Sequence, residues 1–116
     1  MNRFPKKQRI KTSSEFNVVF NEGTKFVCPE FVALSNGTTK LHPRLGVVVS
    51  KKVGNAVVRN KIKRSFREIF RQFSKRENLH QRDFIFIARN SVRKLSFGEL
   101  SLAVSKSFQW FERKLT

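Results

Sequence analysis

Cysteine and long apolar runs are scarce in this 116-residue chain, and each scarcity excludes a class of protein. The single cysteine, Cys28, excludes an internal disulfide framework and is typical of a protein in a reducing compartment. No apolar run approaches the roughly 20 residues of a transmembrane helix, and none follows the basic N-terminus as a signal peptide requires. We therefore expect a soluble cytoplasmic protein, with a single domain of modest core over residues 1–116.

Acidic residues are also rare, and this shortage bears most directly on the partner. Eight Asp and Glu stand against 25 Lys and Arg, so the net charge is +17 and the isoelectric point is about 11.4. Tyrosine is absent, but 13 phenylalanines make the chain too apolar for a disordered tail. The usual partner of so basic a folded surface is a polyanion, so we expect nucleic acid, with an anionic membrane surface as the alternative.

The positive charge is concentrated in two segments. Residues 1–11 hold five Lys and Arg and no acid, and we expect them to form a flexible basic arm. Residues 51–76 hold ten Lys and Arg against Glu68 alone, which is a net charge of +9. Because a surface built only for solubility would mix the signs, this concentration predicts a binding face.

Capping patterns predict where the helices begin and end. Thr12-Ser13-Ser14-Glu15 is a capping-box pattern that begins a short helix, and Gly23 ends it. Asn55 is the expected N-cap of a helix over about residues 56–74. A second capping box at Ser96–Glu99 begins a last helix that runs to about residue 114.

Apolar runs between these helices predict strands. Pro29 marks an edge, a bulge or a break within the first of them, because proline cannot donate to a strand ladder. The expected strands cover residues 26–35, 45–50 and 83–88. The order helix, strands, helix, strand, helix predicts an α+β sandwich, in which the helices pack on a small sheet.

The helix expected over residues 56–74 divides into two faces. At 100° per residue, its apolar side chains fall within an arc of about 120°, which suits docking on the sheet. These side chains are Val58, Ile62, Phe66, Ile69, Phe70 and Phe73. The opposite arc holds Asn60, Lys63, Arg64, Arg67 and Arg71, and Arg59 lies at the boundary.

This row of cations predicts a phosphate-binding face. Like charges three and four residues apart repel one another, so a sequence selected only for stability would place acids among them. The one acid of the segment, Glu68, falls outside the arc. Arginine suits bidentate contact with phosphate, and Lys51 and Lys52 extend the row before the turn at Gly54.

The segment Arg44–Arg64, RLGVVVSKKVGNAVVRNKIKR, closely resembles the signature of the bacterial ribonuclease P protein subunit. The hallmark of that family is an Arg-Asn-Arg-type helix, which is here Arg59-Asn60-Lys61, a departure that preserves the charge. The resemblance extends to Arg9–Lys11, to Glu15-Phe16 with Phe20 and Gly23, and to Asp83–Arg89, so it covers nearly the whole chain.

The resemblance implies both a fold and a function. The family fold is an αβββαβα sandwich with a left-handed βαβ crossover, which is a rare hand. The protein would be the non-catalytic subunit of an endoribonuclease that removes the 5′ leader of precursor tRNA. A large catalytic RNA would hold the active site and most of the Mg²⁺ ions that do the chemistry, with no small-molecule cofactor. The implied RNA-binding residues are Lys51, Lys52, Asn55, Arg59, Asn60, Lys61, Lys63, Arg64, Arg67 and Arg71.

The resemblance also implies a leader-binding cleft between the first helix and the sheet, at Phe16, Phe20, Val32 and Leu34. Stacking on aromatic rings suits a single-stranded leader, which presents no groove to read. Judged from the helix alone, Phe16 and Phe20 fit the core at least as well, so both interpretations stay open. The family often has an aromatic hydroxyl in place of Leu34, so we expect weaker stacking in this chain.

No pattern predicts catalysis by the protein itself. His42, His80 and Cys28 have no partners at metal-ligand spacing, and the carboxylates are scattered singly, so no catalytic or metal-binding residue is expected.

Two other functions remain as alternatives. A ribosomal protein or tRNA chaperone would carry similar charge but leave the Arg44–Arg64 segment unexplained. A membrane-surface protein would need exposed apolar groups beside the cations.

Overall fold

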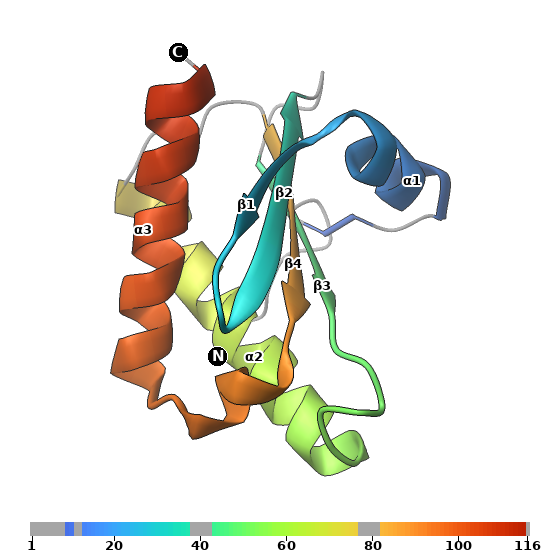
Figure 1. Cartoon of the computed structure of the whole chain (residues 1–116). Helices are drawn as coiled ribbons and strands as arrows, with labels where there is room; N and C mark the ends of the chain where they lie inside the picture. The colour runs from blue at the N-terminus through green and yellow to red at the C-terminus, as the bar shows by residue number, and fades with distance from the viewer. Residues whose placement is uncertain (1–8, 11–12, 38–42, 77–81, 116) are drawn as a thin grey trace.

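The computed structural model describes residues 9–10, 13–37, 43–76 and 82–115 (Figure 1). The order of elements is αβββαβα, which confirms the expected fold class, and a short 3₁₀ helix that the sequence did not predict precedes the last helix. The elements are α1 (Ser13–Glu22), β1 (Thr24–Val27), β2 (Phe31–Gly37), β3 (Arg44–Val48), α2 (Ala56–Arg76), β4 (Arg82–Ala88), η2 (Asn90–Lys94) and α3 (Phe97–Leu115).

The strand expected over residues 26–35 is a hairpin. β1 ends at Val27 and β2 begins at Phe31, so Pro29 lies in the turn between them. Of the three alternatives for Pro29, the break in the strand is confirmed. The turn is closed by the Cys28 N–H, which donates to the Phe31 carbonyl at 3.0 Å. A proline in this turn leaves no ladder hydrogen bond unmade.

The four described strands form one mixed sheet in the order β1-β2-β4-β3. β2 is antiparallel to both β1 and β4, whereas β3 and β4 are parallel neighbours joined through α2. β4 lies inside the sheet, as its continuous apolar run predicts. The hand of the β3-α2-β4 crossover stays a prediction of the family resemblance.

The helices cover the two faces of this sheet unequally. α2 and α3 lie on one side and α1 on the other (Figure 1). The larger core fills the first side, where Phe31, Phe66 and Phe86 pack with their rings 5.3 to 5.9 Å apart. A smaller cluster under α1 contains Ile10, Val19, Leu34 and Ile85. The sheet therefore separates the large core from the surface that carries α1.

Two of the predicted caps hold the helix starts. The Val58 N–H donates to the Asn55 side-chain oxygen at 3.0 Å, so Asn55 caps α2 as predicted. At the start of α3, the Glu99 N–H donates to the Ser96 hydroxyl at 3.1 Å, and the Ser96 N–H donates to the Glu99 carboxylate at 2.8 Å. These hydrogen bonds hold the pKa of Glu99 below its ordinary value. Thr12 of the first capping pattern lies outside the described residues.

The prediction that residues 1–11 form a flexible basic arm is wrong for residues 9–10, which are the described part of that segment. Arg9 forms a parallel bridge with Leu45 of β3, and the Ile10 N–H donates to the Leu45 carbonyl at 3.0 Å. The Ile10 side chain is only 6% exposed and belongs to the cluster under α1. Burial of this side chain, together with the backbone hydrogen bond, fixes residues 9–10 along β3. The other arm residues lie outside the described part of the chain.

Candidate nucleic-acid interface

α2 turns its cations away from the core. Phe66, Ile69 and Phe70 are buried against the sheet and α3, which confirms the predicted apolar face. Of the predicted RNA-binding residues, the exposed ones are Lys51, Lys52, Asn55, Asn60, Lys61 and Arg64, and the half-buried ones are Arg59, Lys63, Arg67 and Arg71. The face of α2 opposite the core therefore carries the row of charge that the sequence predicts.

One residue of the first basic segment, Arg9, lies near this face. Arg9, held along β3, lies close enough to Arg67 of α2 for its charge to act on that residue. Burial and then the positive charge of Arg9 lower the pKa of Arg67. An anion bound near both groups would relieve this repulsion, so the pair favours a phosphate. Sequence reasoning missed this neighbour, because it treated residues 1–11 as an arm.

Arg59 lies at the boundary of the two faces, as predicted. Within the described part of the chain, its Nε is buried and has no hydrogen-bond partner. A buried donor without a partner costs about 1–3 kcal/mol. This position is therefore not optimised for the stability of the free protein.

The C-terminal end of the row differs from the prediction. Arg71 donates from Nε and a terminal nitrogen to the two oxygens of Glu68, at 3.1 and 2.5 Å. This pairing raises the pKa of Arg71. Glu68 lies three residues before Arg71, so the two side chains are neighbours on the helix surface. The helical projection placed Glu68 outside the cationic arc, but its side chain is long enough to reach Arg71 at the edge of that arc. Arg71 is therefore a weaker candidate for phosphate contact than Arg64 or Arg67.

A second surface, here called the α1 surface, consists of Phe16 and Phe20 of α1 with Val32 of β2. The two rings stack with their centroids 6.4 Å apart and their planes at 28°. Phe20 is 41% exposed, whereas Phe16 is half-buried and packs closely on Gly46 of β3. Phe16 thus fits both interpretations, because it packs on the sheet and against the cluster under α1 while staying partly exposed.

Leu34 corrects the expectation for this surface. It is only 4% exposed and belongs to the cluster under α1, with Val19 and Ile85. A side chain buried this deeply supports the α1 surface from below and offers no area to RNA. The sequence could not predict the burial of Leu34, because Val32 and Leu34 alternate onto the same face of β2. They differ in how far α1 covers each of them, which only the tertiary structure decides.

A buried ion-pair network joins α1 to the sheet. Arg44, at the start of β3, donates from Nε and a terminal nitrogen to both oxygens of Asp83, at 2.8 and 2.7 Å. Its other terminal nitrogen donates to the Glu15 carboxylate of α1. The hydrogen bonds to Asp83 and then to Glu15 raise the pKa of Arg44 despite its burial. The sequence signal for the pair is that each of two parallel strands carries a charged residue just before its apolar run.

Comparison with known proteins assigns the family. The Ribonuclease P family profile matches residues 4–112, which is nearly the whole chain. The chain belongs to the ribonuclease P protein family. A ribonuclease P protein component from Streptococcus pneumoniae (strain Hungary19A-6) is 40% identical in an alignment of 107 residues that covers 87% of this chain and 86% of that protein.

Solved structures of the ribonuclease P protein family share the fold. A Staphylococcus aureus RNase P protein mutant with defective mRNA degradation activity superposes with a TM-score of 0.84 at 31% identity, over 92% of this chain and 90% of that one. The RNase P protein from Thermotoga maritima gives a TM-score of 0.76 at 28% identity, over 86% of this chain and 94% of that one.

Membership of the ribonuclease P family fixes the broad function. The chain is the protein subunit of the ribonuclease P holoenzyme, an endoribonuclease that processes the 5′ leader of tRNA. Its partners are accordingly the ribonuclease P RNA and the tRNA substrate. None of the helices in the described ranges combines the length and the apolar character that crossing a membrane requires.

The described residues of this ribonuclease P protein do not fit a Mg²⁺ site. Among them, no group of three or more His, Cys, Asp and Glu side chains could hold a metal ion. Glu15 and Asp83 bind Arg44, Glu68 binds Arg71, and Glu99 caps α3. These carboxylates already have partners within the protein, so they are poor candidates for the oxygen ligands that Mg²⁺ requires.

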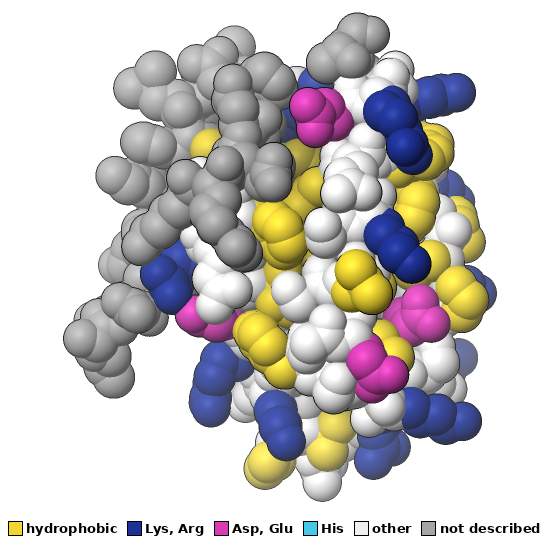
Figure 2. Space-filling model, turned by 90° about the vertical axis from the view of Figure 1, so that its left-hand side faces the viewer, with side chains coloured by type: hydrophobic (Ala, Val, Ile, Leu, Met, Phe, Trp, Pro, Cys, Tyr) yellow, Lys and Arg dark blue, Asp and Glu magenta, His cyan; other side chains and the backbone are white. Residues whose placement is uncertain are grey.

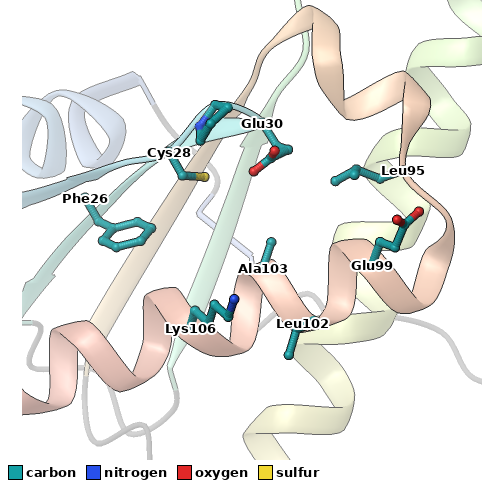
Figure 3. A pocket seen from close by; sticks show the side chains of 9 residues that line it. Phe26, Cys28, Glu30, Leu95, Glu99, Leu102, Ala103 and Lys106 are labelled. Atoms are coloured by element: carbon teal, nitrogen blue, oxygen red, sulfur yellow. The ribbon is translucent and has the colours of Figure 1, made fainter.

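The α3 side of this ribonuclease P protein contrasts with the α2 face. Figure 2 shows acidic and apolar side chains interspersed among the cations there. A hollow of about 400 Å³ lies between the β1–β2 turn and α3, lined by Phe26, Cys28 and Glu30 on one side and by Glu99 and Lys106 on the other (Figure 3).

Burial raises the pKa of the Cys28 thiol, which donates to the Phe31 carbonyl at 3.3 Å, so Cys28 has a packing role as expected.

Proposed function

We propose that this subunit binds the catalytic RNA through the α2 cations and holds the 5′ leader of precursor tRNA on the α1 surface. The two surfaces lie on opposite faces of the sheet, so one protein can contact both RNAs at once. The hydrolytic chemistry then belongs to Mg²⁺ ions held mainly by the RNA subunit. The proposal also places the protein in the cytoplasm, without a membrane partner or a small-molecule cofactor.

The observation that carries the first half is the one-sided charge of α2. Its core side is occupied by buried aromatic residues, and among the described residues of α2 the one exposed large apolar side chain is Val57, whereas a membrane surface needs a band of such groups beside the cations. Arg64 is exposed, and the positive charge of Arg9 acts on Arg67. Repulsion within such a row is relieved when phosphates bind, and counterion release adds to the affinity.

The second half rests on the stacked rings of α1, of which that of Phe20 is exposed. Phe20 keeps 41% of its surface open, whereas most of the other described phenylalanines are buried and only Phe97, at the start of α3, is comparably exposed. Each base that stacks on such a ring contributes about 1–3 kcal/mol to the binding of a single strand. The surface offers stacking without hydrogen-bond readout, so we expect little dependence on leader sequence.

A double charge reversal tests the assignment of α2. Arg64→Glu with Arg67→Glu should weaken assembly with a bacterial ribonuclease P RNA by about 10- to 100-fold, because it places acids opposite phosphates. The matched control is Lys106→Glu with Arg113→Glu on exposed positions of α3, which makes the same change in net charge. Equal losses in the two variants would show that only total charge matters, and would refute the assignment.

Phe20→Ala tests the α1 surface. The preference for precursor tRNA over mature tRNA should fall by about 5- to 150-fold, as expected for the loss of one stacked base. Assembly with the catalytic RNA should stay unchanged, because α2 lies on the other side of the sheet. An unchanged preference in a folded variant would remove the α1 surface from leader binding.

The absence of protein catalysis is tested in two ways. The purified protein should show no nuclease activity above background at any Mg²⁺ concentration, yet should raise cleavage by the catalytic RNA at low Mg²⁺. Glu15, Glu22, Glu30 and Asp83, replaced singly by their amides, should leave the chemical step of the folded holoenzyme nearly unchanged. A loss of about a hundredfold or more in that step from one amide would indicate a catalytic acid or base in the protein.

A further inference from the structure

Arg44 lies where three elements of the fold meet. It is 8% exposed at the start of β3, and it pairs with Asp83 of β4 and with Glu15 of α1. Asp83 is its register neighbour in the parallel β3–β4 ladder, so that half of the network lies within the sheet. The Glu15 half is different, because it crosses from the sheet to a helix that carries the α1 surface.

α1 depends on such contacts for its orientation. It has ten residues, and an isolated helix of this length is marginal in water. The buried Val19 holds it against the sheet, but apolar contacts have little directional preference. A hydrogen-bonded ion pair fixes both distance and direction, and Glu15 supplies one in the first turn of the helix.

The orientation of α1 decides which way its rings face. Successive side chains on a helix turn by 100°, so a roll of the helix about its axis would redirect Phe16 and Phe20 together. Glu15 directly precedes Phe16, and the Phe16 ring fits closely on Gly46. The ion pair and this close contact therefore act on the same roll angle.

We propose that Glu15, held by Arg44, is a positioning residue for the leader: it fixes the roll of α1 and thereby the stacking faces of Phe16 and Phe20. This inference rests on the proposed leader-binding role of the α1 surface. Glu15 is the suitable member of the network to test, because its side chain is 27% exposed and that of Asp83 only 7%. Removing the more buried partner would leave the Arg44 charge uncompensated inside the protein.

The test uses the full chain reconstituted with a bacterial ribonuclease P RNA, and measures the ratio of affinities for precursor and mature tRNA. Glu15→Ala should lower this ratio about tenfold, and Glu15→Gln, which keeps an acceptor for Arg44, about threefold. Assembly with the catalytic RNA should not change. Glu22→Ala, an exposed acid at the other end of the same helix, is the matched control and should stay within about twofold of wild type.

A double-mutant cycle separates positioning from a general loss of stability. If Glu15 acts through the rings, Phe20→Ala should reduce the ratio much less in the Glu15→Ala background than in wild type. If the two substitutions instead lower the ratio independently, so that their fold-changes multiply in the double variant, the inference is overturned. Should Glu15→Ala fail to fold in a thermal melt, Glu15→Gln decides, and a wild-type ratio in that variant overturns the inference.

The same experiments distinguish the two levels of the proposal. A wild-type ratio in folded Phe20→Ala would mean that the α1 surface does not bind the leader, so the proposed function would fail. A reduced ratio in Phe20→Ala with an unchanged ratio in Glu15→Ala would leave the proposed function intact and overturn the role of Glu15.

Discussion

Replacing Gly46 by alanine would place a methyl group against the ring of Phe16. A Cβ atom built on Gly46 lies 2.6 Å from Cζ and 2.7 Å from Cε1 of that ring. Carbon atoms pack comfortably at about 3.5–4.0 Å, so the ring must move by about 1 Å or turn away. Because Phe16 projects from α1, the substitution disturbs the contact between α1 and β3.

The size of the effect follows from two opposing contributions. Overpacking of this kind destabilises proteins by about 1–3 kcal/mol. Alanine in a strand is more favourable than glycine by about 0.5–1 kcal/mol, because the unfolded chain has less freedom to lose. We therefore expect Gly46→Ala to lower the free energy of unfolding by about 1 kcal/mol, within a range of about 0–2.5 kcal/mol.

A cycle with Phe16→Ala makes this prediction specific. Without the Phe16 ring, the clash disappears, and Gly46→Ala should be neutral or stabilising by up to about 1 kcal/mol. The free energies of unfolding of the four proteins can be measured by urea denaturation in phosphate buffer, where bound anions stabilise the cationic surface. Gly37→Ala is the control, because nothing lies within 4 Å of the added methyl group. Effects of the two substitutions that add within about 0.5 kcal/mol would refute the predicted contact.

The remaining predictions concern salt, a helix cap and a thiol. If 6–8 cations contact phosphates, the logarithm of RNA affinity against the logarithm of salt concentration should have a slope of about −4 to −7, and a slope shallower than about −2 would contradict the α2 assignment. Ser96→Ala removes the acceptor of the Glu99 N–H and should lower the free energy of unfolding by about 1 kcal/mol, whereas Ser101→Ala within α3 should not. Because burial raises the pKa of Cys28, iodoacetamide should alkylate this thiol more slowly at pH 7 in the folded than in the urea-unfolded protein, with a steep rise at alkaline pH; equal rates would be the contrary result.

Local features of the chain were predictable, because the residues that make them are close in sequence. The cap at Asn55, the capping box at Ser96 and the two faces of α2 each depend on side chains within one or two turns. Hydrophobic periodicity likewise predicted three helices and the strands that became β3 and β4, whereas the division of residues 26–35 into β1 and β2 and the short η2 helix were not predicted from it. The family resemblance, carried mainly by Arg44–Arg64, then supplied the function that periodicity alone does not specify.

Features that join distant segments required the tertiary structure. Arg44 pairs with Asp83 across 39 residues and with Glu15 across 29, and these partners meet only because β3 lies parallel to β4 with α1 above them. The electrostatic effect of Arg9 on Arg67 likewise depends on where residues 9–10 join the sheet. The sequence by itself thus determined the three helices, most of the strands, the cationic face and the family, which short-range chemistry encodes. Which charges are paired, and which aromatic rings stay exposed, was decided only when the sheet brought remote residues together.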